Sequence, residues 1–211
     1  MSKRFLAILL AIIVVFGGAF YLAKHKSNSA GSSSNNAQPT NHIEGDGKKN
    51  VTLIEYGDYQ CPACGQYYPL LKQVFDTYKS DIHFQFRNFP LVQIHKNAFL
   101  GARAAEAADK QGKFWEMHDI LYEQQQTWGE SNDPTSFFIG YASQLGLNID
   151  TFKADMASAN VNDLINADIQ EGQKLGANST PTFVLNGKKI DNPHSLDDFN
   201  KLIDSAIAGK N

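Results

Sequence analysis

The chain has 211 residues, of which 19 are Lys or Arg and 22 are Asp or Glu. Six of the basic and two of the acidic residues precede residue 51, so the remainder has 13 basic against 20 acidic residues. This acidic surplus repels phosphate backbones and disfavours nucleic-acid binding. With only Cys61 and Cys64 in the whole sequence, a disulfide-rich scaffold or a four-thiolate zinc site is excluded, because either needs more thiols.

The N-terminal segment has the pattern of a membrane signal. Two basic residues, Lys3 and Arg4, precede an uncharged and mostly apolar run over residues 5–23, and two lysines and a histidine follow it. At ~1.5 Å per residue, this run is just long enough to cross the hydrocarbon core of a bilayer. We therefore expect residues 1–26 to be a membrane anchor. A cleaved signal peptide is the alternative, since small residues at 17–19 fit a cleavage site.

Residues 27–46 are predicted to be a flexible linker. Between residues 27 and 41 the sequence is almost entirely Ser, Asn, Gly, Ala, Gln, Pro and Thr, which offers too little apolar surface to offset the entropy of ordering. The remaining residues, 47–211, are predicted to form one domain. Its length of about 160 residues is enough for a single hydrophobic core.

A cysteine pair follows the first predicted strand of this domain. Residues 51–56 are mostly β-branched or apolar, as in a buried central strand. The next helix opens with Cys61-Pro62-Ala63-Cys64, and Pro62 suits the first helical position, where its missing N–H is not needed. Cys61 is therefore the predicted N-cap, where free backbone N–H groups and the helix dipole lower the pKa of a thiol.

We interpret this pair as redox-active rather than as a metal or copper site or an inert bridge. A disulfide across so short a loop stabilises a fold only slightly. A metal site would need further Cys or His ligands, and the nearest downstream histidine is His83.

The downstream pattern predicts a small sheet interrupted by helices. Residues 83–87 alternate like a strand, after which β signals vanish for about 90 residues. Asn186-Gly187 then joins two short β runs, over 182–185 and 188–190, into a hairpin. Ser195 is the predicted cap of a last helix that reaches about residue 208. Helices are predicted between these strands over residues 97–110, 114–126, 134–145, a short stretch after 150, and 160–175.

These motifs resemble those of DsbA-like thiol-disulfide oxidoreductases of the thioredoxin superfamily. The shared features are Glu55 six residues before Cys61, the C-P-x-C helix start, and Thr180-Pro181 before a late strand. Gly65 and the phrase from Phe114 to His118 match as well. The resemblance implies an α/β chain with a thioredoxin fold and an inserted helical domain at about residues 91–176.

The resemblance also implies roles for individual residues. Cys61 and Cys64 are the expected catalytic thiols, and Glu55 is the expected buried acid that exchanges a proton with Cys64. Pro181 is expected to follow a cis bond and to face the cysteines. The residues expected to contact substrate surround the pair: Pro62, Ala63, Thr180 and Pro181. No metal or other cofactor is expected.

We expect a disulfide-forming oxidase that passes the Cys61–Cys64 disulfide to exported proteins through a mixed disulfide on Cys61, because oxidation prevails outside the cytosol. The alternatives are a disulfide reductase or isomerase and, in a different class, a copper-binding dithiol module. Ala63 stands where the best-known strong oxidase of the family carries His. This departure implies weaker oxidising power.

The expected partners and location follow from the same resemblance. The substrates would be exported proteins with free thiols. A membrane protein linked to quinone, of the DsbB or vitamin-K-epoxide-reductase type, would reoxidise the pair. We expect a monomer at the cell membrane, held by the N-terminal anchor with its catalytic domain outside the cytoplasm, or a secreted or periplasmic protein if the segment is cleaved.

Overall fold

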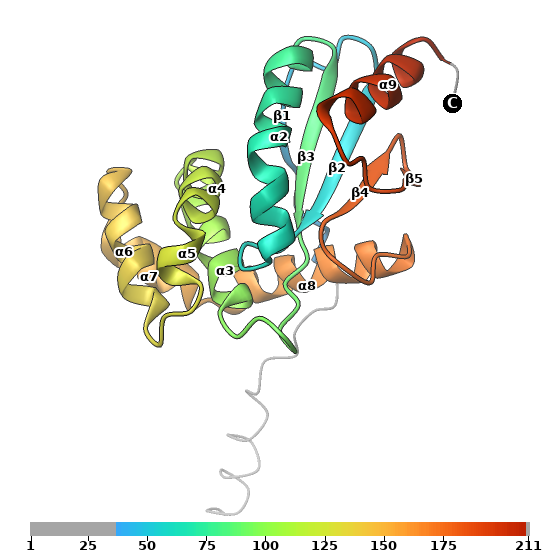
Figure 1. Ribbon diagram of the computed structural model, residues 1–211. Helices are drawn as coiled ribbons and strands as arrows, with labels where there is room; N and C mark the ends of the chain where they lie inside the picture. Colours follow the sequence, from blue (N-terminus) through green and yellow to red (C-terminus); the bar gives the residue numbers. More distant parts are fainter. Residues whose placement is uncertain (1–36, 210–211) are drawn as a thin grey trace, which may run out of the picture. The chain divides into compact units, whose positions relative to one another are not determined.

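The structure, a computed structural model, describes residues 37–209 (Figure 1). The predicted anchor at 1–26 and the first ten residues of the predicted linker lie outside these residues. Within residues 37–209, no helix combines the length and the apolar character needed to cross a membrane.

A five-stranded sheet in the order β1-β3-β2-β4-β5 forms the centre of the fold. Its strands are β1 (His42–Glu44), β2 (Val51–Gly57), β3 (Ile82–Asn88), β4 (Thr182–Leu185) and β5 (Lys188–Lys189). β2 and β3 pair in parallel along their whole length, while the other neighbours are antiparallel. The predicted central strand and the C-terminal hairpin are therefore confirmed.

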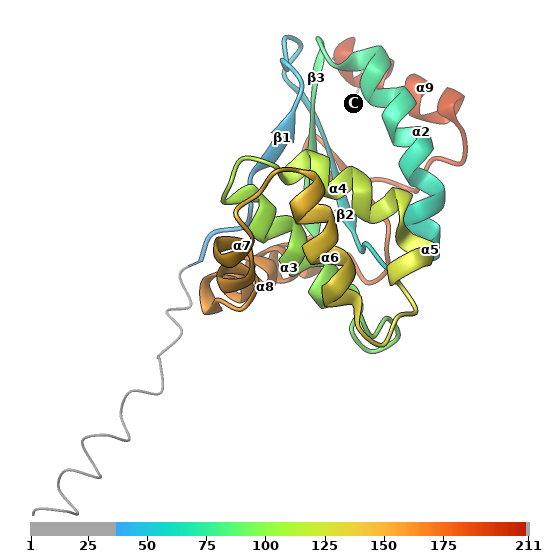
Figure 2. The same cartoon turned by 90° about the vertical axis from the view of Figure 1, so that its left-hand side faces the viewer.

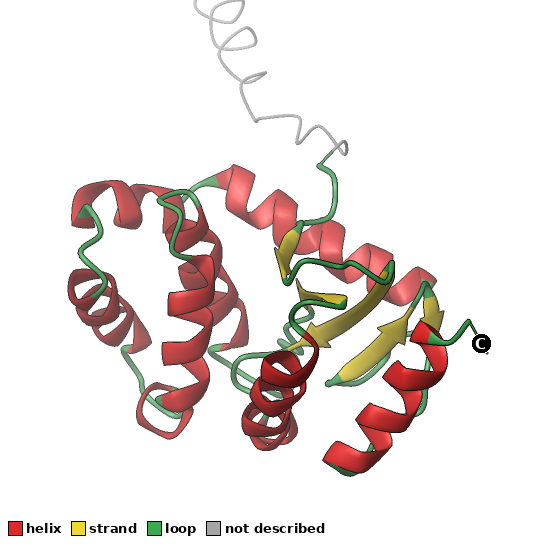
Figure 3. Cartoon of the chain, turned by 90° about the horizontal axis from the view of Figure 1, so that it is seen from above, coloured by secondary structure: helices red, strands yellow, loops and turns green. Residues whose placement is uncertain are grey.

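Helices cover both faces of the sheet (Figures 1 and 3). α2 (Pro62–Tyr78) and α9 (Leu196–Ile207) pack on one face, where their apolar residues share a core with Leu53 of β2. α8 (Ala159–Lys174) lies against the other face, above Tyr56 of the same strand. Since successive strand residues point to opposite faces, Leu53 and Glu55 point toward α2 and Tyr56 toward α8.

The chain between β3 and β4 is helical, as predicted. The helices of this region other than α8 lie to one side of α2 (Figure 2). They pack into one hydrophobic core around Phe138, Phe152 and Trp128. Four buried alanines of α3, from Ala104 to Ala108, let neighbouring helices approach closely because they carry only a methyl group. The segments are α3 (Ala98–Asp109), α4 (Phe114–Glu123), α5 (Gln125–Trp128), α6 (Pro134–Gln144), α7 (Ile149–Met156) and α8.

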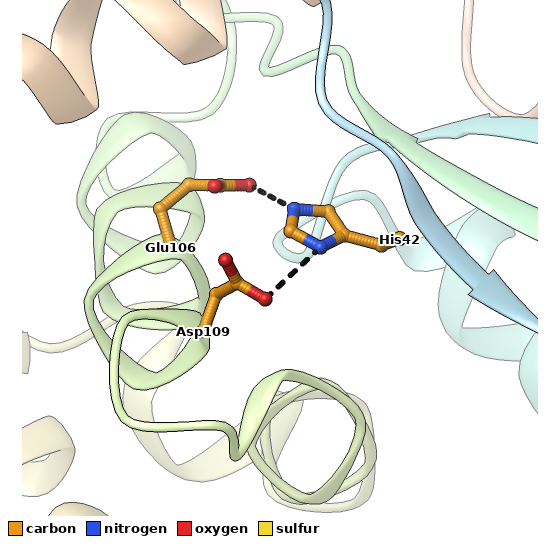
Figure 4. A group of neighbouring side chains, drawn as sticks. All are labelled: His42, Glu106 and Asp109. Carbon is orange, nitrogen blue, oxygen red and sulfur yellow. Dashed lines mark hydrogen bonds and ion pairs between the residues drawn. The ribbon is translucent and has the colours of Figure 1, made fainter.

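The folded domain begins earlier than the sequence predicts. β1 lies inside the predicted linker 27–46, and Thr40 and His42 are buried. The His42 ring reaches two carboxylates of α3, with Nε2 at 2.8 Å from Glu106 Oε1 and Nδ1 at 3.3 Å from Asp109 Oδ1 (Figure 4). The predicted boundary at residue 47 is therefore corrected to about residue 37, because distant acidic groups hold this polar segment.

His42 is best described as a protonated ring between two carboxylates. Burial alone would lower its pKa, but hydrogen bonds to Asp109 and Glu106 outweigh it and raise the pKa to about 9. The three groups lie close enough to hold a metal ion. However, both ring nitrogens already donate to carboxylates, so the geometry is that of an ion triad.

Asp168 of α8 binds the segment around β1 through Thr40. Its carboxylate accepts hydrogen bonds from the backbone N–H and hydroxyl of Thr40, at 2.7 and 2.8 Å, and from the backbone N–H of Asn88 at 2.9 Å. Arg87 contributes an ion pair at 3.3 Å. A fully buried carboxylate is tolerated when it is paired in this way.

Candidate active site

The cysteine pair sits at the start of α2, where β2 ends. Cys61 is the N-cap, with extended backbone (φ −68°, ψ 121°), and Pro62 is the first helical residue. The backbone N–H of Cys61 donates to the carbonyl of Asp58 at 3.0 Å, which closes the turn between strand and helix. This placement confirms the predicted start of the helix.

The two thiols have opposite environments. Cys61 is 6% exposed, whereas Cys64 is completely buried. The hydrogen bond that Cys61 accepts from the Cys64 thiol is the largest cause of its shifted pKa. Together with those from the backbone N–H groups of Cys64 and Ala63 it outweighs burial and lowers the pKa of Cys61 to about 5. Burial, together with the neighbouring Cys61 and Glu55, raises the pKa of Cys64. This difference in acidity favours Cys61 as the nucleophile and Cys64 as the buried, protonated partner.

The Thr180-Pro181 segment lies against Cys61 although 119 residues separate them in the sequence. The Thr180–Pro181 bond is cis, as the resemblance implies. The Cys61 thiol donates to the carbonyl oxygen of Thr180 at 3.4 Å. Asn192 holds this segment by donating to the carbonyl of Pro181 at 2.8 Å.

The other two expected substrate contacts lie on the outer side of the helix start. Pro62 is exposed and Ala63 is partly exposed. The structure thus brings all four expected substrate contacts around one thiol.

Glu55 lies under the pair, in the position expected from the strand pattern. Its side chain is 1% exposed, and its Oε1 atom has no hydrogen-bond partner among the described residues. Burial, and to a smaller degree Cys61, raises the pKa of this carboxyl group to about 8. A carboxyl group with such a pKa can both donate and accept a proton near neutral pH.

Asp58 shapes the loop that carries the pair. Its carboxylate accepts from the backbone N–H of Gln60 and of Leu91, at 2.8 and 2.9 Å, and contacts His95 Nδ1 at 2.7 Å. Gln60 in turn accepts from the backbone N–H of Asn97 at 2.6 Å. These bonds attach the active-site loop to the segment after β3.

Gln125 of the helical insert is a site residue that the sequence does not reveal. Its side-chain amide donates to the carbonyls of Tyr59 and Cys61, at 2.8 and 2.9 Å. Gly65 makes room for it, because a Cβ atom there would lie 2.5 Å from Gln125 Oε1. No local motif signals a contact that joins residues more than 60 positions apart.

Comparison with known proteins agrees with this geometry. The profile of the thioredoxin family matches residues 37–205. BdbD from Bacillus subtilis, in its oxidised crystal structure, is 26% identical with a TM-score of 0.69, and the match covers 82% of this chain and 97% of BdbD. A thioredoxin-like oxidoreductase from Silicibacter pomeroyi is 26% identical with a TM-score of 0.67, over 80% of this chain and 93% of that one.

More distant or partial matches complete the comparison. Wolbachia pipientis α-DsbA1 shares the fold, with a TM-score of 0.72 at 21% identity, over 84% of this chain and 98% of that one. A Na(+)/H(+) antiporter NhaA 1 from Salinispora arenicola is 34% identical over 168 residues, which are 80% of this chain and 25% of the antiporter. The chain thus spans about a quarter of the length of the curated relatives that it matches.

The chain belongs to the thioredoxin family. In its fold, a thioredoxin core with a helical insert and a C-P-x-C pair beside a cis-proline, it resembles DsbA-like thiol-disulfide oxidoreductases.

Proposed function

We propose that the protein is a disulfide-forming oxidase that acts outside the cytoplasm and passes the Cys61–Cys64 disulfide to exported proteins. The observation that carries this proposal is the asymmetry of the two thiols. A protein that stabilises the Cys61 thiolate stabilises its own reduced form, so its disulfide is a good electron acceptor.

The reaction starts at Cys61, the thiol nearer to solvent. A substrate thiolate attacks the Cys61 sulfur, forms a mixed disulfide with it, and releases Cys64, which takes a proton from the carboxylic acid of Glu55. A second substrate thiolate then attacks the substrate sulfur of the mixed disulfide and releases Cys61 as a thiolate. Two electrons pass from the substrate thiols to the cysteine pair.

Substrate binding is proposed to involve the four residues around Cys61. The segment at Thr180 and Pro181 lies against the sulfur, and Pro62 and Ala63 form the exposed edge of the helix start. Backbone pairing with an extended substrate tolerates many side chains. Such tolerance suits an enzyme that acts on many unfolded exported proteins.

The proposed location and partners extend the same function. The apolar run at residues 5–23 would hold a monomeric enzyme at the membrane, with its catalytic domain on the outer side. There, a quinone-linked membrane protein of the DsbB or vitamin-K-epoxide-reductase type would take two electrons from the reduced pair and restore the disulfide.

A redox titration against glutathione, combined with trapping of the in-cell redox state by thiol alkylation, tests the direction of electron flow. We expect a reduction potential between about −270 mV and about −120 mV, the values of thioredoxin and DsbA, and mostly oxidised protein in cells. Mostly reduced protein would instead identify a reductase. The Cys64→Ser variant should accumulate mixed disulfides on Cys61, and the Cys61→Ser variant should accumulate none.

A further inference from the structure

A cavity of about 190 Å³ lies beneath the active site, between α2, α4 and the sheet. Glu55 of β2 and His118 of α4 line its buried part, and both side chains are at least nine-tenths buried. Lys72 and Asp119, which also line it, are 50% and 37% exposed and form an ion pair at 2.9 Å. The cavity therefore connects the buried acid to the protein surface.

The chemistry of His118 suits proton transfer. Its Nδ1 lies 3.2 Å from Asp119 Oδ1, and a carboxylate only accepts hydrogen bonds, so Nδ1 carries the hydrogen. The other ring nitrogen, Nε2, has no partner among the described residues. Burial lowers the pKa of His118, so the ring is neutral at pH 7 and Nε2 is free to accept a proton.

Asp119 completes an arrangement that can hold the proton once His118 has taken it. Burial alone would raise the pKa of Asp119, but hydrogen bonds from His118 and Lys72 lower it to about 2. It therefore remains ionised and stabilises a protonated imidazole beside it. A carboxylate that holds a histidine in this way fixes both the tautomer and the orientation of the ring.

We propose that this cavity is the path by which Glu55 exchanges its proton with solvent, that water fills it, and that His118 carries the proton across it with Asp119 as its positioning residue. The inference rests on the proposed role of Glu55. A volume of about 190 Å³ has room for several water molecules, and its walls offer the polar partners that buried water needs.

The proton balance of the reaction requires such a path. When Cys64 leaves the disulfide it takes the proton of Glu55, which must then regain one from outside. During reoxidation the flow reverses, because Cys64 must lose its proton to Glu55 before its thiolate attacks the mixed disulfide on Cys61. In both directions one proton crosses between a fully buried carboxyl group and solvent.

Other titratable groups surround His118 and contribute to any pH profile. Tyr59, Tyr68 and Tyr122 pack against its ring. His42 acts on it through its charge. The remaining ones share the cavity with it: Glu44 of β1, Glu55 of β2, Lys72 and Asp76 of α2, and Asp119 of α4.

The test is the single-turnover reduction of the oxidised full-length protein by dithiothreitol, measured from pH 5 to 9. His118→Gln should slow the reaction about tenfold and flatten its pH profile. That loss is smaller than the 10²–10⁴-fold contributed by a group that transfers the proton directly. Added imidazole should restore the rate of His118→Ala, since the truncated side chain leaves space in a cavity that opens to solvent. His194→Gln, on the exposed surface, is the control.

Combining His118→Gln with Glu55→Gln shows whether His118 transfers a proton or only supports the structure. Without the acid there is no proton to carry, so adding His118→Gln should change nothing further and imidazole should have no effect. Multiplying losses in the double variant, or a wild-type rate and profile for His118→Gln, would overturn the inference. A wild-type rate for Glu55→Gln itself would instead refute the proposed role of Glu55.

Asp119→Asn keeps the experiment decisive if the buried histidine cannot be replaced without unfolding. Asp119 is partly exposed, so this change leaves the core intact. It removes the charge that stabilises the protonated ring, and it should slow the reaction severalfold while circular dichroism stays unchanged. A rate equal to that of the wild type would contradict the inference.

Discussion

At the scale of single residues, the site depends on one buried acid and two thiols, and the surroundings of these groups shift their pKa values in different directions. Cys61 and Cys64 are chemically identical, yet hydrogen bonding lowers the pKa of one and burial raises that of the other. In the proposed mechanism, this difference assigns attack to Cys61 and resolution to Cys64. The same mechanism uses Glu55 as the proton donor, because a buried thiolate at Cys64 is unstable without a proton.

The first prediction concerns the donor that stabilises the Cys61 thiolate. The largest contribution is the hydrogen bond from the Cys64 thiol, so Cys64→Ala should raise the pKa of Cys61 from about 5 toward the ordinary value of about 8.5. Cys64→Ser keeps a hydroxyl donor and should leave the pKa low. Thiolate absorbance near 240 nm against pH measures both. Equal pKa values in the two variants would contradict the assignment.

The second prediction follows from the pKa of Glu55, which is raised from 4.5 to about 8. Between these values the folded chain binds one proton more than the unfolded chain, so stability falls as the pH rises from 4.5 to 8. The loss amounts to about 3 kcal/mol at pH 7. Glu55→Gln removes this dependence, so its free energy of unfolding should vary less with pH in that window.

Urea unfolding of the reduced protein at pH 4.5, 6 and 8 measures this difference. Glu130→Gln is the matched control, because its side chain is 88% exposed and should follow the wild type at every pH. If Glu55→Gln also parallels the wild type, the carboxyl group is ionised in the folded protein and is not available as an acid.

At the scale of secondary-structure elements, the start of α2 is fixed by elements that are remote in sequence. β2 delivers the chain to Cys61, the Thr180-Pro181 segment lies against the sulfur, and the helical insert holds the loop through Gln125. The insert therefore does more than enlarge the fold. Gln125 gives the buried carbonyl of Tyr59 a side-chain donor, and it gives the carbonyl of Cys61 a second donor beside the backbone N–H of Gly65.

The third prediction tests this support. Gly65→Ala places a methyl group 2.5 Å from Gln125 Oε1 and should displace the side chain from both carbonyls, with a loss of about 2 kcal/mol in the free energy of unfolding. In a Gln125→Ala background the same change should be neutral or stabilising, because the obstacle is gone and Ala favours a helix over Gly by about 1 kcal/mol.

Gly140→Ala is the control for this cycle. It lies within α6, and a Cβ atom there meets nothing within 4 Å, so the change should stabilise the protein by about 1 kcal/mol. Chemical unfolding of the wild type and the three variants of the cycle gives the coupling energy. Equal effects of Gly65→Ala with and without Gln125 would show that the contact does not matter.

At the scale of the whole molecule, the sequence predicts the parts that local patterns encode. The apolar run of β2, the proline at the start of α2 and the Asn186-Gly187 turn each determine a nearby structure, and all three are confirmed. β1 escapes prediction because its residues are polar and its stability comes from pairing with β3 and from acids on α3 and α8.

The site also combines features that local patterns encode with contacts that they do not. The cysteine pair and its N-cap position can be predicted from the sequence, and the family resemblance predicts that Thr180 and Pro181 lie beside the pair. Gln125 and His118 could not be assigned in the same way. Gln125 contacts a loop that is remote in sequence, and His118 lines a cavity with residues of other elements. The sequence around His118 shows only an apolar helix face.

The last prediction compares the stability of the oxidised and reduced proteins. In the reduced form the pKa of Cys61 is lowered from 9 to about 5, so its thiolate stabilises the folded chain above pH 5, by about 3 kcal/mol at pH 7. The oxidised form has no thiolate and lacks this stabilisation. Its disulfide instead restricts the unfolded chain, which stabilises the folded protein by about 2 kcal/mol for a loop of four residues.

The reduced protein should therefore be the more stable form at pH 7, by about 1 kcal/mol. Because a lowered pKa contributes stability that disappears as the pH falls through the folded-state value, the order should reverse as the pH approaches 5. Guanidinium unfolding of both forms at pH 5, 6 and 7 measures the difference. A Cys61→Ser/Cys64→Ser double variant has neither the thiolate nor the disulfide, so its free energy of unfolding is the reference at each pH. An oxidised form that is the more stable one at pH 7 would mean that the folded protein favours its own disulfide, as a reductant does.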